Sequence, residues 1–168
     1  MGQASEYNFL ITKGGPTQLK ITVNISWHKP TKHWFKLNID GAYKIDAQKS
    51  GVGDVIRNHT GKWILGIQMQ HITTSPLPTE LQAIHERLQI ANKYYLFPLE
   101  VETDSTEAIM AIQQDHLVLS NLVVACRSLM HHRKDLLLRH KFRKGNQVAH
   151  MLAKDAAKEN YKQLSLQY

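Results

Sequence analysis

The chain has 168 residues, of which 42% are hydrophobic and 21% are charged. These proportions are normal for a single globular domain that buries a core of its own, and they exclude a low-complexity or fibrous chain. The formal charge is +7 and the isoelectric point is about 9.5, so the chain favours a polyanionic partner.

The single cysteine, Cys126, lies in an apolar run, and one cysteine excludes an internal disulfide framework. No apolar stretch has the length that crosses a membrane, and the first residues lack the apolar segment of a secretion signal. We therefore expect an intracellular protein, in the nucleus or the cytoplasm, that is not secreted, does not enter a membrane and is a monomer.

Along the chain, we expect a poorly defined lead-in at 1–30, a domain at 31–160 and a frayed tail at 161–168. Two β-like runs in the lead-in, 7–12 and 19–25, are separated by a Gly-Gly-Pro breaker. They form either a hairpin or a loosely ordered segment.

The domain begins with a strand predicted at 33–44, in which apolar and polar residues alternate. Asp40 follows the apolar residues and Gly41 comes next. An Asp in such a place is poorly solvated unless a positive charge lies beside it, and a glycine lets another group approach closely. The pair is therefore either a simple turn that closes a hairpin or a metal ligand at the edge of a sheet.

Two β-rich runs follow, at 51–57 and 63–68, and the short glycine-ending turn between them predicts a hairpin. Ser75 and Pro76 are typical of a helix start, as the N-cap and first helical residue. Glu80 lies in the second turn of that helix. An acid there either interacts favourably with the helix dipole or contributes to a site.

The strand predicted at 99–104 ends on Asp104, and a helix begins after Ser105. In α/β folds, sites gather at the carboxyl ends of strands. The remaining pattern predicts a helix at 117–129, an apolar strand at 136–138 and a last helix at 148–156.

Asp40, Glu80 and Asp104 converge at one edge if the two acid-ending strands are neighbours in a sheet. Three converging carboxylates repel one another unless a divalent cation lies among them, and oxygen ligands suit Mg²⁺ or Mn²⁺. In a basic protein, a pair of such ions indicates phosphodiester cleavage. The basic segments 131–134 and 139–144 are either a solvated surface or contacts to a phosphate backbone.

Short motifs occur in a fixed order between residues 27 and 158. They are Trp27-x-x-Pro30, Trp34-Phe35-Lys36-Leu37-Asn38-Ile39-Asp40-Gly41-Ala42, Gly51-Val52-Gly53-x-Val55-Ile56-Arg57, Ser75 with Thr79-Glu80-Leu81, Glu102-Thr103-Asp104-Ser105, His140-x-x-Arg143-x-x-Asn146-x-x-Ala149, and Leu152-Ala153-Lys154. Together they resemble the type-one ribonuclease H domain. The resemblance is strongest to the plant-type version, found alone or at the end of retroelement reverse transcriptases.

The resemblance implies an α/β fold of the ribonuclease H-like type, in which a five-stranded mixed sheet, antiparallel first and then parallel, is flanked by helices. It also implies hydrolysis of the RNA strand of RNA–DNA hybrids with two Mg²⁺ or Mn²⁺ ions. Asp40, Glu80 and Asp104 match three of the family's four metal-binding acids, and His140 matches its mobile histidine. The residues expected to bind nucleic acid are Gly41, Ser75, Arg139, Lys141, Arg143, Lys144 and Asn146.

The chain departs from the family at His150, which stands where the fourth acid is expected. A neutral imidazole removes a negative charge and prefers softer metals, so we expect hydrolysis with Mg²⁺ to be weakened. Two alternatives remain beside a weakened nuclease. The domain could bind hybrid or duplex nucleic acid without cutting it, or serve as a protein-interaction module on this fold.

Overall fold

A computed structural model of the chain describes residues 5–11, 19–44, 49–72, 75–114, 120–131, 133–158 and 164–167. Parts of the predicted lead-in, of the helix at 117–129 and of the basic segment at 131–134 lie outside these ranges. Within them, no helix combines the length and the apolar character that crossing a membrane requires.

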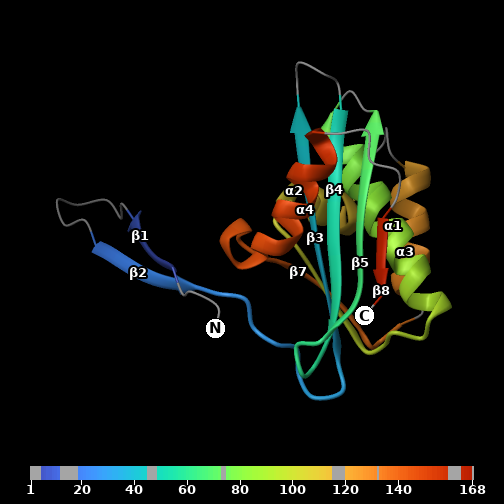
Figure 1. Cartoon of the computed structure of the whole chain (residues 1–168), viewed down its shortest axis with the longest axis horizontal. Helices are drawn as coiled ribbons and strands as arrows, with labels where there is room; N and C mark the ends of the chain where they lie inside the picture. The colour runs from blue at the N-terminus through green and yellow to red at the C-terminus, as the bar shows by residue number, and fades with distance from the viewer. Residues whose placement is uncertain are drawn as a thin grey trace.

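Within the described residues, six strands form the main sheet in the spatial order β7-β6-β3-β4-β5-β8 (Figure 1). Their bounds are Phe35–Lys44 for β3, Lys49–Asn58 for β4, Trp63–Ile72 for β5, Leu99–Thr103 for β6, Leu136–His140 for β7 and Leu164–Gln167 for β8. Two earlier strands, β1 (Ser5–Ile11) and β2 (Leu19–Ile25), pair as a separate hairpin. The hairpin alternative for the lead-in is therefore the one observed.

The pairing confirms the predicted mixed sheet, because β3, β4 and β5 are antiparallel neighbours and β3, β6 and β7 are parallel ones. The sixth strand differs from expectation. Residues 164–167 were expected to fray, yet β8 pairs antiparallel with β5. A strand edge carries unpaired N–H and C=O groups, so this short segment satisfies groups that β5 would otherwise leave open.

The helices also lie where the sequence predicts them. Their bounds are Pro76–Lys93 for α1, Thr106–Gln113 for α2, Ser120–His131 for α3 and Gln147–Lys158 for α4, which follows the short 3₁₀ helix η2 (Arg143–Asn146). The helix α1 packs on the face of the sheet that carries Leu37 and Ile39, with α2 and α3 beside it, and α4 covers the opposite face (Figure 1).

Small residues let α4 approach the sheet closely. A Cβ atom added at Gly53 would lie 2.3 Å from the Ala149 carbonyl oxygen and 2.3 Å from the Ala153 nitrogen. One added at Gly51 would lie 2.0 Å from the Ala153 oxygen and 2.4 Å from the Ala157 nitrogen. These clashes involve backbone that cannot move aside, so the two glycines and the alanines of α4 fix the helix on β4.

On the other face, a buried ion pair joins α1 to β4. Arg87 Nε lies 2.5 Å from Asp54 Oδ2, and the two side chains are 1% and 0% exposed. Burial raises the pKa of Asp54 to about 6, although the charge and the hydrogen bond of Arg87 lower it. The pair fixes the helix that carries Glu80 against the sheet.

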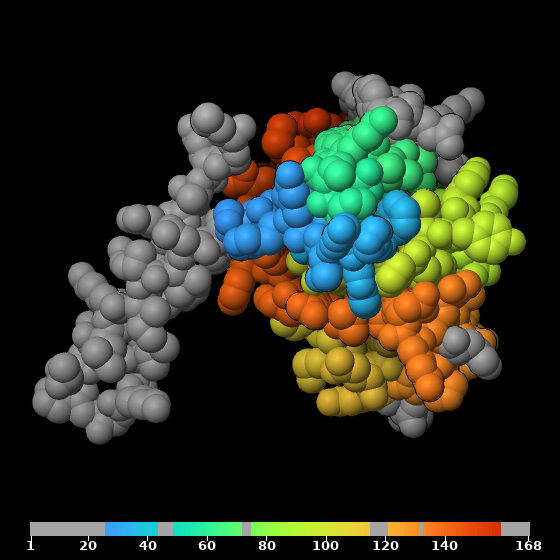
Figure 2. Space-filling model, turned by 90° about the horizontal axis from the view of Figure 1, so that it is seen from below, coloured from blue at the N-terminus to red at the C-terminus, as the bar shows by residue number. Residues whose placement is uncertain are grey.

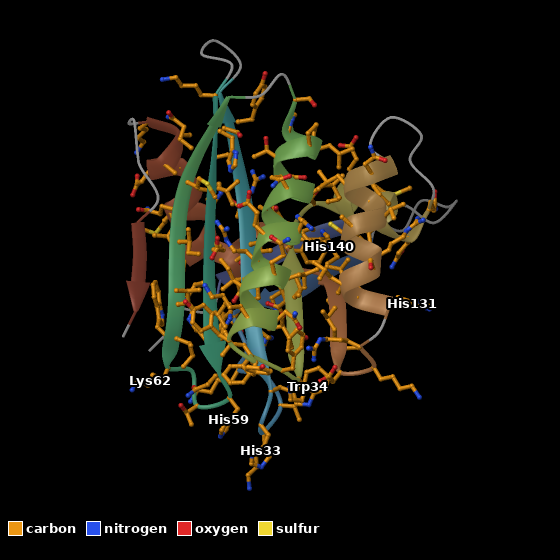
Figure 3. All side chains as sticks on the ribbon, turned by 90° about the vertical axis from the view of Figure 1, so that its right-hand side faces the viewer. His33, Trp34, His59, Lys62, His131 and His140 are labelled. Carbon is orange, nitrogen blue, oxygen red and sulfur yellow. The ribbon has the colours of Figure 1, made fainter. Side chains whose placement is uncertain are left out.

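The lower end of the sheet in Figure 1 is formed by residues 26–34 and by the turn between β4 and β5, which lie side by side in the view from below (Figure 2). The rings of His33 and His59 are 5.5 Å apart at this end, where Lys62 also lies (Figure 3). None of the three predicted acids lies here.

Candidate active site

Two of the predicted acids lie on adjacent parallel strands. Ile39 of β3 is in register with Thr103 of β6, so Asp40 and Asp104 follow at the same level. Asp40 is buried, with only 1% of the residue exposed. The third acid comes from α1, because a Cβ atom at Gly41 would lie 3.3 Å from Glu80 Cγ. A side chain at position 41 would therefore press against the side chain of Glu80.

The electrostatics show that the three carboxyl groups influence one another. The pKa of Asp40 is raised to about 9, mainly by burial and also by the hydrogen bond and the charge of Asp104. The Arg143 charge lowers the pKa of Asp40, and the Glu80 charge raises it. The pKa of Glu80 is likewise raised to about 7, mainly by burial and also by the charge of Asp104, while a hydrogen bond with Ser105 opposes the rise.

The two carboxyl oxygens of Asp40 have different surroundings. Oδ2 lies 2.6 Å from His150 Nδ1, whereas Oδ1 is buried and makes no hydrogen bond to a fixed donor within the described residues. Ionised carboxylates only accept hydrogen bonds, so Asp40 bonds to Asp104 only when one of the two carries a proton. When Asp40 is ionised, its buried Oδ1 atom is unfavourable unless a proton or a cation binds to it.

His150 on α4 stands where the fourth acid was expected. Burial lowers the pKa of His150, the charges of Arg143 and Lys154 lower it further, and Asp104 raises it. The raised pKa of Asp40 and the lowered pKa of His150 agree with a neutral pair that shares one proton. In this pair, the Nδ1 atom of the imidazole is occupied by Asp40.

Arg143 provides a second internal partner for the acids. Its Nε lies 2.8 Å from Asp104 Oδ2, and the Arg143 side chain is 60% exposed while that of Asp104 is 12% exposed. Buried Asn146 donates from Nδ2 to the Ile39 carbonyl oxygen at 2.7 Å, which ties η2 to β3. Asn146 thus positions Arg143 over the acids, and in this structure its side chain is not at the surface.

The acids fit a hard divalent cation in part. Three carboxylates with one unpaired buried oxygen are a suitable donor set for Mg²⁺ or Mn²⁺. The fourth position does not fit, because its imidazole is bonded to Asp40. Among the described residues, no group of three or more His, Cys, Asp or Glu side chains is arranged so that it could hold a metal ion without moving.

The other predicted contact residues lie around this centre. Arg139 is exposed and pairs with Glu100 at 3.3 Å, and the Lys141 backbone N–H donates to the Thr103 carbonyl oxygen next to the acids. His140 is exposed, with its ring edge-on to the exposed Phe142 ring at 5.1 Å. Lys144 is exposed, and Ser75 is the N-cap of α1, although its side chain makes no capping hydrogen bond.

Sequence reasoning missed a buried polar network on the same face of the sheet. Lys36 Nζ and Asn38 Nδ2 each donate to a carboxylate oxygen of Glu102 at 2.8 Å. Trp27 Nε1 donates to Asn38 Oδ1 at 2.9 Å, and the Arg57 guanidinium stacks 4.8 Å from the Trp27 ring. The signal was present in the opposite charges that β3 and β6 bear at matching positions.

The mixed sheet, the helices on both faces and the acids at adjacent strand ends define a ribonuclease H-like domain. The chain belongs to the reverse transcriptase-like family, whose model matches residues 38–156. A ribonuclease H protein of Arabidopsis thaliana is 31% identical over 144 residues, which cover 83% of this chain. The chain spans only 23% of that relative's length.

Solved structures show the same fold. Ribonuclease H1 from Halobacterium salinarum superposes with a TM-score of 0.64 at 21% identity, covering 73% of this chain and 96% of that one. LC11 ribonuclease H1, solved in complex with an RNA/DNA hybrid, gives 0.65 at 19% identity, with 73% and 96% covered. The foamy viral protease–reverse transcriptase bound to an RNA/DNA hybrid gives 0.66 at 14% identity, with 88% and 24% covered.

Proposed function

We propose that this domain binds RNA–DNA hybrids and hydrolyses their RNA strand, slowly and with a divalent cation. The observation that carries the proposal is the convergence of Asp40, Glu80 and Asp104, with Asp40 Oδ1 buried and without a fixed donor. Support also comes from the basic charge of the chain and from relatives of the same fold that were solved with RNA/DNA hybrids bound.

The three acids would hold the cation, with Asp40 as its buried ligand. When bound, such an ion activates water and stabilises the negative charge that develops on the phosphate. Arg143 keeps the charge of Asp104 balanced when no cation is there, and its exposed side chain is free to turn toward a phosphate. His140, exposed at the end of β7, is suited to move a proton at the rim of the site.

His150 explains why the reaction is slow in this proposal. An acid at this position would add a negative ligand, whereas the imidazole adds none and also occupies Asp40 Oδ2. Loss of one fixed group that supports the stabilisation of transition-state charge lowers rates by about 100-fold or more. We therefore propose weak activity in Mg²⁺ and stronger activity in Mn²⁺, which accepts nitrogen ligands more readily.

The test is the cutting of a labelled RNA–DNA hybrid by the wild type and by His150→Asp, in Mg²⁺ and in Mn²⁺. We expect His150→Asp to raise the rate in Mg²⁺ by about 100-fold. Asp40→Asn, purified in the same way, measures any contaminating host nuclease. Absence of cutting by both the wild type and His150→Asp, in both metals, would overturn the nuclease proposal.

A second candidate function, binding without cutting, is favoured by one specific observation. His150 and Arg143 already partner Asp40 and Asp104, so the acids are largely balanced by groups of the chain itself. This function is supported if the wild type shifts the hybrid on a gel but only His150→Asp cuts it. If the wild type also fails to bind hybrid at low salt, a protein-interaction module is the remaining function.

A further inference from the structure

A groove of about 530 Å³ runs from residues 41–43 of β3 along α4. Its walls include Arg143, His150, Lys154 and Lys158, of which the arginine and the two lysines are charged. His150 and the two lysines occur at intervals of four residues, so they lie on one face of α4, about 6 Å apart along the helix axis. The described residues that line the groove include no acid.

The groove is continuous with the candidate active site. Arg143 bonds to Asp104 and His150 bonds to Asp40, and both residues also line the groove. The Lys154 charge acts on His150, which shows that the stripe of positive charge begins beside the acids. From there it continues to the last turn of α4, where Lys158 is located.

The two lysines are able to contact a ligand in solvent. Lys154 and Lys158 are both exposed, and the side chain of Lys158 is 61% exposed. Lys158 forms an ion pair with Asp155 at 3.2 Å, but Asp155 is itself 53% exposed. An exposed pair of this kind contributes little stability, so a phosphate can replace the carboxylate at little cost.

We propose that this α4 groove binds the phosphate backbone of a single nucleic-acid strand that continues beyond the acids. The inference rests on the proposed function and adds a strand-binding site to it. Lys154 and Lys158, about 6 Å apart along α4, together with Arg143 suit neighbouring phosphates of one strand, and the groove is too small to enclose a duplex. A strand that leaves the hybrid at the acids therefore has a charged path along α4.

The test compares a blunt RNA–DNA hybrid with one that carries a single-stranded RNA extension at either end. Binding is followed by fluorescence anisotropy in EDTA, which prevents cation-dependent cutting, over a series of salt concentrations. The variant is Lys154→Gln/Lys158→Gln. The charge-matched control is Lys62→Gln/Lys93→Gln, in which Lys62 lies at the far end of the sheet (Figure 3).

For the wild type and the control, we expect an extension to strengthen binding. For Lys154→Gln/Lys158→Gln, this gain disappears, and the slope of log K against log salt for the extended hybrid falls by about 1.4, because two contacts to a single strand are lost. Asp155→Asn, which frees Lys158, should increase the gain. Thermal unfolding shows whether each variant is folded.

The outcomes separate this inference from the function on which it rests. If Lys154→Gln/Lys158→Gln keeps the gain, the α4 groove is not the site, while binding of the hybrid stands. If the blunt hybrid weakens as much as the extended one, the stripe contacts the duplex and the single-strand inference is wrong. If the wild type binds neither probe at low salt, the inference and the proposed function are both wrong.

Discussion

At the scale of residues, burial favours the neutral form of Asp40, whereas cation binding requires its ionised form. Its carboxyl group is buried beside two other acids, so the ionised form is costly without a cation, and the neutral form is favoured in the metal-free protein. Function and stability therefore make opposite demands on this residue, which is usual for active sites.

The first prediction concerns the pH dependence of stability without divalent ions. The pKa of Asp40 is raised from 3.8 to about 9 on folding, so the folded state binds more protons than the unfolded state between those values. Stability should therefore fall as pH rises through this window. Asp40→Asn removes that loss, and we expect it to raise the free energy of unfolding at pH 8 by about 1–3 kcal/mol.

Urea unfolding in EDTA at pH 5 and pH 8 measures the effect of Asp40→Asn. The advantage of the variant should be smaller at pH 5, where less of the stability has been lost. The exposed Asp155→Asn is the control and should change stability by no more than about 0.5 kcal/mol. An equal advantage of Asp40→Asn at both pH values would contradict the prediction.

Some residues of the site can be recognised from the local sequence, and others cannot because their burial depends on distant parts of the chain. Asp40 and Asp104 each follow apolar strand residues, a pattern visible along the chain. Lys36 and Asn38 alternate with apolar residues as they would on a solvent-facing strand, yet they are 3% and 2% exposed. Burial depends on Trp27 and on other groups distant in sequence, which a local pattern does not include.

At the scale of elements, α4 packs closely on the sheet because Gly51 and Gly53 of β4 have no side chains. We predict that Gly53→Ala displaces α4 and lowers the free energy of unfolding by about 3 kcal/mol or more, because the added Cβ meets helix backbone at 2.3 Å. Gly66→Ala is the matched control on β5. Its Cβ would meet the Trp63 ring at 3.3 Å, and a side chain adjusts more easily than a helix.

Chemical denaturation of the two glycine variants gives the comparison. Gly66→Ala should cost about 1 kcal/mol or less. A similar small cost for Gly53→Ala would show that α4 is not fixed by this close approach. Because His150 is on α4, Gly53→Ala should also weaken the contact between His150 and Asp40.

The ion pair between α1 and β4 gives a third prediction. Arg87→Met leaves Asp54 buried without its partner, and we expect a loss of about 3–5 kcal/mol in the free energy of unfolding. Replacing both residues, as Arg87→Met/Asp54→Leu, removes the buried charges together. We expect the double variant to recover most of that loss, since apolar groups replace such pairs at little cost.

Urea denaturation of Arg87→Met, Asp54→Leu and the double variant completes the double-mutant cycle. Equal losses for Arg87→Met and for the double variant would show that packing, and not charge, decides the effect. Recovery in the double variant would show that the pair specifies the position of α1 more than it stabilises the fold.

The predictability of the elements follows from their size and periodicity. The helix α1 was predicted because its apolar residues recur at helical spacing behind a Ser-Pro start. The strand β8 was missed because its alternation of apolar and polar residues, LSLQ, extends over only four residues. Whether such a segment pairs depends on an open edge at β5, and that edge exists only after the sheet has formed.

At the scale of the whole molecule, the candidate site and the edge strand β8 lie in different parts of the sheet. Asp40 is on β3 and Asp104 directly follows β6, whereas β8 closes the distant edge at β5, with β4 between β5 and β3. Closing that edge protects the sheet from pairing with other chains and does not touch the site.

We therefore predict that deleting residues 164–168 lowers the free energy of unfolding by about 1–3 kcal/mol, because the ladder with β5 is lost. Hydrogen exchange should speed up at the β5 amides that face β8, and remain slow at the amides between β3 and β6. Light scattering should show more self-association, since the β5 edge becomes open. Hybrid binding should be unchanged. If protection is lost across the whole sheet, β8 is required for the fold and is not merely a cover for its edge.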